Sequence, residues 1–299
     1  MKLQSKHLLT GGELDNKELI YLLELANELK TNRYSYSTVL HQKHLALMFD
    51  KHSLRTRISF TLAMRELGGD IVESQNNNRK QEEPEDQMRV LQGYCDAVMI
   101  RTHADETINR MQTVASVPLI NGLSNFYHPC QALADLMTLQ EKFHQLKGLK
   151  IAFVGDGNNV LHSLLLMAPK LGVEVHYSCP VNYGPDPEIL QEAHKNVGRG
   201  SITSFNNPMS AVKNCHAVYT DVWTSMGFEE RNIESFEGFQ VDEVLMAHAE
   251  PEALFMHCMP MNRGQEVSLT LPDQPCSVIF QQSENRLHVQ KALLYQLLY

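Results

Sequence analysis

The sequence predicts an α/β protein with two doubly wound domains, each built on a central, mostly parallel sheet flanked by helices. Short β-branched or aliphatic runs alternate with segments of helical spacing along almost the whole chain, which is typical of βαβ units. The alternation breaks near Gly148 and then starts again. The length of 299 residues also exceeds that of one typical domain.

The first half, residues 1–146, contains the elements expected of one domain. A first helix is predicted from Asp15 to Leu29, because Asp15 and Glu18 have the spacing of a capping pair. The strands and helices that follow are expected at His44–Phe49, Thr56–Leu67, Ile71–Glu73, Glu85–Tyr94, Ala97–Ile100, Glu106–Ala115, Pro118–Ile120 and Pro129–Leu146.

The second half, residues 147–282, repeats the alternation. A helix expected from Asn159 to Leu171 contains Pro169, which should kink it or end it early. A last helix is expected from Ser283 to the end of the chain. The strands are predicted at Lys150–Val154, Val173–Tyr177, Ile202–Phe205, Ala217–Thr220 and Leu254–Met256.

Composition and charge exclude several classes of protein. A formal net charge of -9 argues against binding of nucleic acid, which needs a surplus of Lys and Arg. No apolar run is long enough for a membrane helix, and the N-terminus does not have the pattern of a secretion signal. The six cysteines form no C-x-x-C pair, which argues against a zinc site or a disulfide framework. We therefore expect a cytoplasmic protein without membrane or nucleic-acid partners.

Residues Ser53–Arg57, with the sequence Ser-Leu-Arg-Thr-Arg, follow one predicted strand and open a predicted helix. Ser53 lies where a helix N-cap is expected, so first-turn N–H groups would lie beside two guanidinium groups and a hydroxyl group. A helix N-terminus favours an anion, and arginine adds bidentate phosphate binding. The alternative is an ordinary capped helix with solvated arginines, and composition alone does not separate the two.

A second group, His128–Gln131, opens the long helix of the first half. An imidazole and an amide at a helix start could bind a carbonyl or amide group. A lone histidine is more often structural, so in isolation the structural interpretation is favoured.

The third group is Gly155–Asn159, directly after a predicted strand. It is similar to a dinucleotide-binding fingerprint, but Val160 stands where the third glycine would fall. The paired asparagines instead suit hydrogen bonding to a small polar ligand.

The remaining polar groups lie at two further strand ends and at the expected start of the last helix, namely Asp221–Gly227, His257–Pro260 and Arg286. In open parallel sheets, ligands gather at the carboxyl ends of strands. Cys258 could be a nucleophile if its thiolate were favoured, or a small apolar residue in the core. Taken alone, Arg286 would be a surface charge.

Together, in this order and spacing, these segments resemble the aspartate/ornithine carbamoyltransferase family over essentially the whole chain. Ser53–Arg57 resembles the S-x-R-T-R phosphate motif of that family, and His128–Gln131 resembles its H-P-x-Q carbamoyl motif. His257–Pro260 is similar to the H-C-x-P form found in ornithine-specific members, where aspartate enzymes have an apolar residue in place of the cysteine. Asp221–Gly227 resembles the D-x-W-x-S-M-G loop that binds ornithine.

The resemblance implies two α/β domains with an active site between them. The first would hold carbamoyl phosphate, the second would hold L-ornithine, and the last helix, 283–299, would pack back on the first. It also implies a homotrimer with active sites near the subunit interfaces. The expected reaction transfers the carbamoyl group to the δ-amine of ornithine.

The same resemblance implies a role for each matched residue. Arg101, Thr56 and His128 would polarise the carbonyl oxygen. Asp221 and Cys258 would orient the amine and help to deprotonate it. Carbamoyl phosphate would bind to Ser53, Leu54, Arg55, Thr56, Arg101, His128, Gln131, Cys258, Met259 and Arg286. Ornithine would bind to Asn159, Asp221, Ser225 and Met226. The reaction calls for no metal and no organic cofactor.

Residues 75–81 depart from the family pattern, because they lack its usual glycine-bearing sequence. Asn77 or Lys80 are candidates for a contact with a neighbouring subunit. Three alternatives stay open on sequence: a carbamoyltransferase for another acceptor such as putrescine or an acylated ornithine, an NAD-dependent oxidoreductase, and a non-catalytic partner protein that kept the fold.

Overall fold

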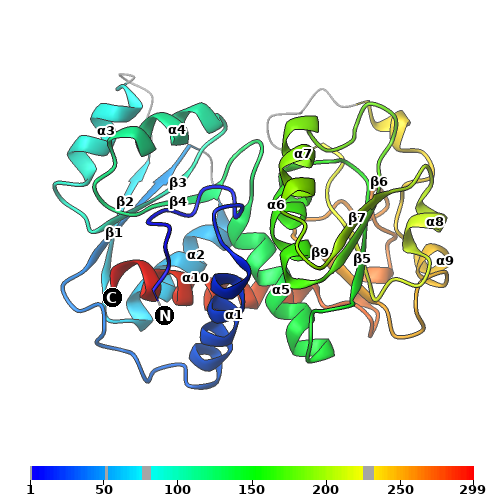
Figure 1. Ribbon diagram of the computed structural model, residues 1–299, viewed down its shortest axis with the longest axis horizontal. Helices are drawn as coiled ribbons and strands as arrows, with labels where there is room; N and C mark the ends of the chain where they lie inside the picture. Colours follow the sequence, from blue (N-terminus) through cyan, green and yellow to red (C-terminus); the bar gives the residue numbers. More distant parts are fainter. Residues whose placement is uncertain (1, 51–52, 76–81, 225–231) are drawn as a thin grey trace. The chain divides into compact units, whose positions relative to one another are not determined.

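The computed structural model describes residues 2–50, 53–75, 82–224 and 232–299. Two compact units emerge, one comprising Met1–Met137 with Asn285–Tyr299 and the other comprising Thr138–Glu284. Each unit contains a parallel sheet flanked by helices, which confirms the predicted fold class (Figure 1). The assignment of carbamoyl phosphate binding to residues 1–146 and of ornithine binding to residues 147–282 stays a prediction.

The first unit is built on a four-stranded sheet in the order β2-β1-β3-β4, with all neighbouring strands parallel. The elements in the chain up to the second sheet are α1 (Asn16–Thr31), β1 (His44–Phe49), α2 (Leu54–Glu66), β2 (Asp70–Gln75), α3 (Pro84–Leu91), β3 (Ala97–Arg101), α4 (Asp105–Val114), β4 (Leu119–Leu123) and α5 (Pro129–Phe143). The predicted capping box of α1 is confirmed, since the Glu18 backbone N–H donates to Asp15 Oδ1 at 2.8 Å and the Asp15 N–H donates to Glu18 Oε2 at 2.8 Å.

Helices cover both faces of this sheet, because its strands are apolar on both sides. Alternate strand residues such as Ala46 and Val98 pack with Met88 of α3 and Met111 of α4 in one buried cluster. Figure 1 shows α3 and α4 on one side of the sheet and α2 on the other. Full burial of each large apolar side chain contributes about 1.5–3 kcal/mol.

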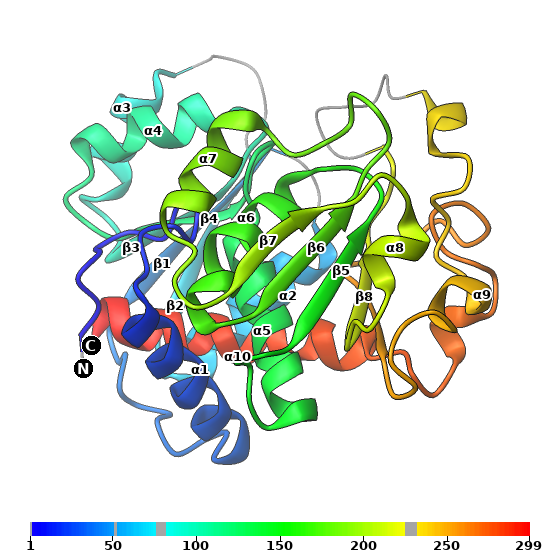
Figure 2. The same ribbon diagram turned by 45° about the vertical axis from the view of Figure 1, so that its right-hand side comes forward.

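The second unit is built on a five-stranded parallel sheet in the order β7-β6-β5-β8-β9, with α6 and α7 on one face and α8 and α9 on the other (Figure 2). Its elements are β5 (Lys150–Val154), α6 (Asn159–Met167), the 3-10 helix η1 (Ala168–Leu171), β6 (Glu174–Ser178), α7 (Pro187–Lys195), β7 (Ser201–Ser204), α8 (Pro208–Val212), β8 (Ala217–Thr220), η2 (Ile233–Phe236), α9 (Glu243–Met246), β9 (Leu254–His257) and η3 (Leu271–Asp273). The expected early end of the helix at Pro169 is confirmed, because α6 changes to η1 after Met167.

The last helix, α10 (Ile279–Leu298), begins earlier than predicted. Its first turn is fixed by packing, since Ile279 is fully buried in the apolar cluster that contains Phe255. Arg286 therefore lies inside the helix and not at its start. The prediction was wrong because Ser283 and Glu284 have the character of a helix start, whereas burial of Ile279 decides the actual start.

The strand order places a topological switch point in each sheet. The chain moves outward from β1 to β2 and then returns to the other side of β1 with β3, and it does the same around β5 with β8. The crevice at the carboxyl ends of such neighbouring strands is where ligands bind in open α/β sheets. None of the described helices is long and apolar enough to cross a bilayer.

Candidate functional site

Polar side chains from the two central strands of the first unit bond to one another at the switch point. Ser53 follows β1, and Arg101 is the last residue of β3, where its Cα pairs with that of Phe49. Arg101 Nη1 donates to Ser53 Oγ at 3.0 Å and to Thr56 Oγ1 at 3.3 Å. Arg286 Nη2 donates to the same Thr56 oxygen at 2.6 Å. The structure thus brings together four predicted residues from three segments that are far apart in sequence.

The first turn of α2 retains backbone donors. Ser53 occupies the N-cap position as predicted, but its side chain makes no capping hydrogen bond and accepts from Arg101 instead. Leu54 exposes 69% of its surface, so its contribution to a site would come from its backbone N–H group. Such N–H groups at a helix start favour an anion.

The two arginines of the Ser53–Arg57 motif have different surroundings. Arg57 Nη2 lies 3.1 Å from Glu73 Oε1 on β2, and its guanidinium lies over the Phe49 ring at 5.0 Å. Arg55 is half-buried and contributes positive potential at His128. We infer that Arg57 ties α2 to the sheet, while Arg55 is the arginine available to an anion.

His128 is buried among positive charges at the start of α5. Burial, and then the nearby Arg286, Arg101 and Arg55, hold its pKa well below the usual value of 6.5. The imidazole is therefore neutral at physiological pH, and the surroundings favour a negative ligand over a second cation. Four predicted residues of the first unit share one electropositive environment.

The rest of the His128–Gln131 motif is also buried. Gln131 is fully buried, and its Nε2 donates to Asp135 Oδ1 at 2.8 Å. Cys130 is fully buried, and burial raises the pKa of its thiol to about 12. Cys130 is thus a core residue, because an unreactive thiol is what such burial produces.

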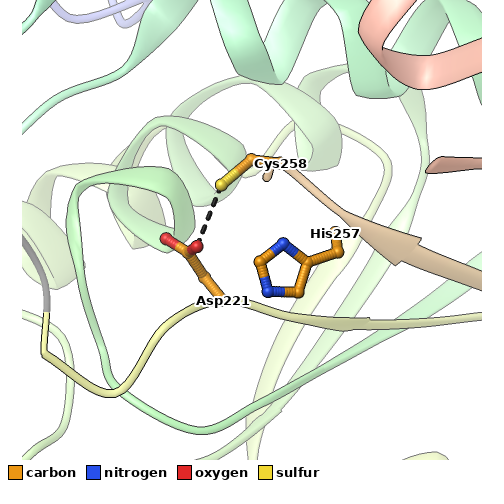
Figure 3. Close-up of side chains that lie close together, drawn as sticks. All are labelled: Asp221, His257 and Cys258. Carbon is orange, nitrogen blue, oxygen red and sulfur yellow. Dashed lines mark hydrogen bonds between the residues drawn. The ribbon is translucent and has the colours of Figure 1, made fainter. Parts of the chain in front are cut away.

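In the second unit, Asp221 connects three loops at the carboxyl ends of β5, β8 and β9. Cys258 Sγ donates to Asp221 Oδ1 at 2.9 Å, as Figure 3 shows. Asn158 Nδ2 donates to Asp221 Oδ2 at 2.6 Å. Only 6% of the Asp221 surface is exposed, and its two carboxylate oxygens accept from the half-buried Cys258 and the buried Asn158.

His257 fixes the turn that carries Cys258. The Met259 backbone N–H donates to His257 Nδ1 at 2.9 Å, so the imidazole proton must lie on Nε2, which is 3.1 Å from Glu266 Oε1. Both His257 and Glu266 are fully buried. The Met259 N–H already donates to His257. The carbonyl oxygens of this turn are therefore the groups that would accept from an N–H donor on a ligand.

Asp221, His257 and Cys258 also form the one group in the described part of the chain that is close enough to hold a metal ion, with potential ligand atoms within 4.8 Å of one another. Both imidazole nitrogens already have partners, and both Asp221 oxygens accept hydrogen bonds. A cation would have to displace one of these two partners from His257. The bonding pattern therefore favours a hydrogen-bonded site over a metal site.

Of the four residues predicted to bind ornithine, Asn159 and Asp221 are described, and both are buried. Ser225 and Met226 lie outside the described residues, as do Asn77 and Lys80. Trp223, the last aromatic residue before that gap, stacks on Phe236 with ring centroids 5.2 Å apart.

The dinucleotide interpretation of residues 155–159 loses its structural basis. A Cβ atom at Gly157 would lie 2.3 Å from the backbone of Gly184 and Pro185. In a dinucleotide fingerprint the second glycine leaves room for a pyrophosphate. Here the same space is filled by the protein's own chain, so Gly157 serves loop packing.

Sequence reasoning missed two residues that support this site. The sequence shows Asn158 next to Asn159, but it does not indicate the contact of Asn158 with Asp221, because the two residues are 63 positions apart. Glu266 follows His257 by nine residues in an irregular segment, and no sequence pattern marks their contact. The first contact arises from the adjacency of β5 and β8 in the sheet, and the second from the fold of the irregular segment after β9.

The lowered pKa of His128 predicts a dependence of stability on pH. The unfolded imidazole takes up a proton near pH 6.5, whereas the folded one resists protonation, so the free energy of unfolding falls as pH drops below about 6.5. We expect His128→Gln to show a smaller loss of Tm between about pH 7.5 and 5.5 than the wild type.

The matched control is His41→Gln, at an exposed histidine, which should reproduce the wild-type dependence. Parallel Tm curves for the wild type and His128→Gln would contradict a buried neutral imidazole.

Comparison with known proteins gives a consistent result for both halves. Residues 6–141 match the family model of the aspartate/ornithine carbamoyltransferase carbamoyl-P binding domain, and residues 147–297 match that of the Asp/Orn binding domain. The ornithine carbamoyltransferase of Bacillus subtilis (strain 168) is 42% identical over 309 residues, covering 99% of this chain and 95% of that protein.

Solved structures agree. The ornithine carbamoyltransferase from Pyrococcus furiosus superposes with a TM-score of 0.93 at 41% identity, covering 98% of this chain and 97% of that one. A mutant of N-acetyl-L-ornithine transcarbamylase complexed with PALAO gives a TM-score of 0.89 at 29% identity, with 98% and 100% covered. The chain is therefore an enzyme of the carbamoyltransferase class and belongs to the aspartate/ornithine carbamoyltransferase family.

Proposed function

We propose that this chain is an ornithine carbamoyltransferase, which transfers the carbamoyl group of carbamoyl phosphate to the δ-amine of L-ornithine and releases L-citrulline and phosphate. The observation that carries the proposal is the hydrogen bond from Cys258 to Asp221, because the cysteine is the feature of the ornithine-specific motif. The relatives named ornithine carbamoyltransferase support it, being 41–42% identical to this chain.

The first unit would bind and activate carbamoyl phosphate. Ser53, Thr56, the Leu54 backbone N–H and the guanidinium of Arg55 would hold the phosphate, with Arg101 alongside. Arg101, Thr56 and His128 would stabilise the negative charge that grows on the carbonyl oxygen as the amine attacks. The hydrogen bonds from Arg101 and Arg286 to Thr56 support this role, because they set the donors in place before a ligand arrives.

The carbamoyl nitrogen is a donor and needs acceptors. Gln131 and the backbone carbonyl groups of Cys258 and Met259 would supply them. Arg286, which has only donors, would be a further contact to an oxygen of carbamoyl phosphate. The engagement of the Met259 N–H by His257 supports this assignment, since it leaves carbonyl groups as the contacts of that turn.

The second unit would bind and orient ornithine. Asp221 and Ser225 would bind the α-amino group, and Asn159 with the Met226 backbone would bind the α-carboxylate. The free δ-amine titrates near pH 10, so only on the order of one molecule in a thousand is neutral at pH 7. Nearby guanidinium groups and loss of water favour the neutral form. Cys258 and Asp221 would then orient the amine and help to remove its proton.

The amine nitrogen forms a bond to the carbonyl carbon, and the bond from that carbon to the phosphate oxygen breaks. The product is a ureido group, and phosphate leaves with the electron pair of the broken bond. The step moves no electrons between redox states, so the proposed reaction needs no redox cofactor. No acyl-cysteine is proposed, because the Cys258 proton is directed at Asp221.

We also propose that the enzyme is a homotrimer. Leu54, Ile58 and Leu62 lie at four-residue spacing on α2 and expose 69%, 49% and 38% of their surfaces. Val72 on the neighbouring edge strand β2 exposes 51%. An exposed apolar face of this kind is typical of an interface. It begins beside Ser53, so a partner subunit would lie near the phosphate-binding residues.

A cytoplasmic location and a role in arginine biosynthesis complete the proposal. The six cysteines are all free, which suits a reducing compartment. Citrulline formation is the step of that synthesis which the proposed reaction would supply.

Arg55→Ala should weaken binding of carbamoyl phosphate by at least about 10-fold, since a hydrogen bond to a charged group contributes roughly 1.5–3 kcal/mol. Calorimetric titration with carbamoyl phosphate measures the change. Arg57→Ala is the matched control two residues away, and it should lose stability but keep binding, because Arg57 contacts Glu73 and Phe49. Unchanged affinity in Arg55→Ala would remove the phosphate assignment.

Steady-state rates with three acceptors test the choice of substrate. We expect kcat/KM for L-ornithine to exceed that for N-acetyl-L-ornithine and putrescine by on the order of 100-fold. N-acetylation removes the charge of the α-amino group that Asp221 would bind, and putrescine lacks the α-carboxylate that Asn159 would bind. The similarity to N-acetyl-L-ornithine transcarbamylase makes the acetylated substrate the more informative comparison. Preference for it over ornithine would overturn the proposal while keeping the reaction class.

Ile58→Glu should convert the trimer to single chains, because it places a charge in the exposed apolar face of α2. Light scattering measures the mass. The matched control is Val181→Glu, at a residue that exposes 85% of its surface in the second unit, and it should stay trimeric. A wild-type protein that runs as one chain at micromolar concentration would contradict the proposal.

A further inference from the structure

Asn158 bonds in two directions at the start of α6. It is the N-cap residue, and its Oδ1 accepts from the backbone N–H groups of Val160 at 3.0 Å and Leu161 at 3.3 Å. Its Nδ2 donates to Asp221 Oδ2 at 2.6 Å. The residue is 1% exposed. One side chain therefore joins the end of β5 to the end of β8.

The orientation of this amide is fixed by its partners. Backbone N–H groups can only donate, so the atom that faces them must be the amide oxygen. The NH₂ group must then face Asp221, whose carboxylate can only accept when ionised. Asn158 is thus held by the helix and can hold Asp221 in turn.

We infer that Asn158 is a positioning residue for the acceptor amino acid, because it holds Asp221 in the orientation that binds the α-amino group. The inference rests on the proposed function and extends it to a residue that would not touch the substrate. Asn158 and Cys258 bind different oxygens of the same carboxylate, so together they fix its plane. Without Asn158, only the bond from Cys258 to one oxygen would orient the carboxylate.

The capping role and the donating role can be separated by substitution. Aspartate caps a helix as well as asparagine does, and its charge is favourable at a helix N-terminus. It cannot donate to Asp221, however, and it places a second carboxylate against the first. Asn158→Asp therefore keeps the cap and removes the hold on Asp221. Asn158→Ser also keeps a capping oxygen, but it has no amide to reach Asp221 and adds no charge.

The test compares both variants with the wild type and with Asn207→Asp. Asn207 is the N-cap of α8 in the same unit, and its Oδ1 accepts from the Ser210 N–H at 2.9 Å, so it undergoes the same change away from Asp221. Steady-state rates give KM for L-ornithine and for carbamoyl phosphate separately. The fluorescence of Trp223, the single tryptophan of the chain, reports binding of L-norvaline, which has the α-amino and α-carboxylate groups of ornithine but no δ-amine.

We expect Asn158→Asp and Asn158→Ser to raise KM for ornithine and weaken norvaline binding by about 10- to 100-fold, the range set by one hydrogen bond to a charged group. KM for carbamoyl phosphate and the Tm should stay near wild type, as should every property of Asn207→Asp. The aspartate variant should be the more impaired of the two because of charge repulsion.

Wild-type ornithine kinetics in both variants would overturn the inference and leave the proposed function intact. A fall in Tm with equal losses for both substrates would also overturn it, because it would reveal a purely structural cap. Absence of ornithine turnover in the wild type would instead refute the proposed function itself, so the two failures are distinguishable.

Discussion

Parallel strand direction is the constraint on which the candidate site depends. In a parallel sheet every carboxyl end lies at the same edge, so the residues that follow neighbouring strands must meet there. In the first unit this brings Ser53, after β1, to Arg101, at the end of β3. In the second it brings Asn158, after β5, to Asp221, after β8. The same geometry, used twice, gathers each set of polar side chains.

The two units differ in the sign of the charge that they gather. The first concentrates guanidinium groups around a neutral His128, which suits a phosphate that carries two negative charges. The second centres on the Asp221 carboxylate, which suits the α-ammonium group of an amino acid. Each charge is held by hydrogen bonds, because a buried charge without partners is costly. The chemistry assigned to each half follows from this difference.

Support for the site comes from side chains that need not meet a substrate. His257 is fixed between the Met259 N–H and Glu266, and it sets the turn that presents Cys258. Arg57 ties α2 to β2 through Glu73, whereas Arg55 is the arginine that we propose for the anion. These contacts hold the proposed site residues in place without a ligand, and preorganisation of this kind reduces the cost of reorientation during a reaction.

Local sequence determined many of the elements and indicated the family. Strands β1, β5 and β8 have their predicted bounds, and the predicted capping box of α1 is present. The motifs indicated the reaction class. These features depend on residues near in sequence. Three features depended on the tertiary structure. They are the start of α10 at Ile279, the hydrogen bond of the Ser53 side chain with Arg101 in place of a helix cap, and the contact between Asn158 and Asp221. Burial and strand adjacency decide them, because both act between residues that only the folded sheet brings together.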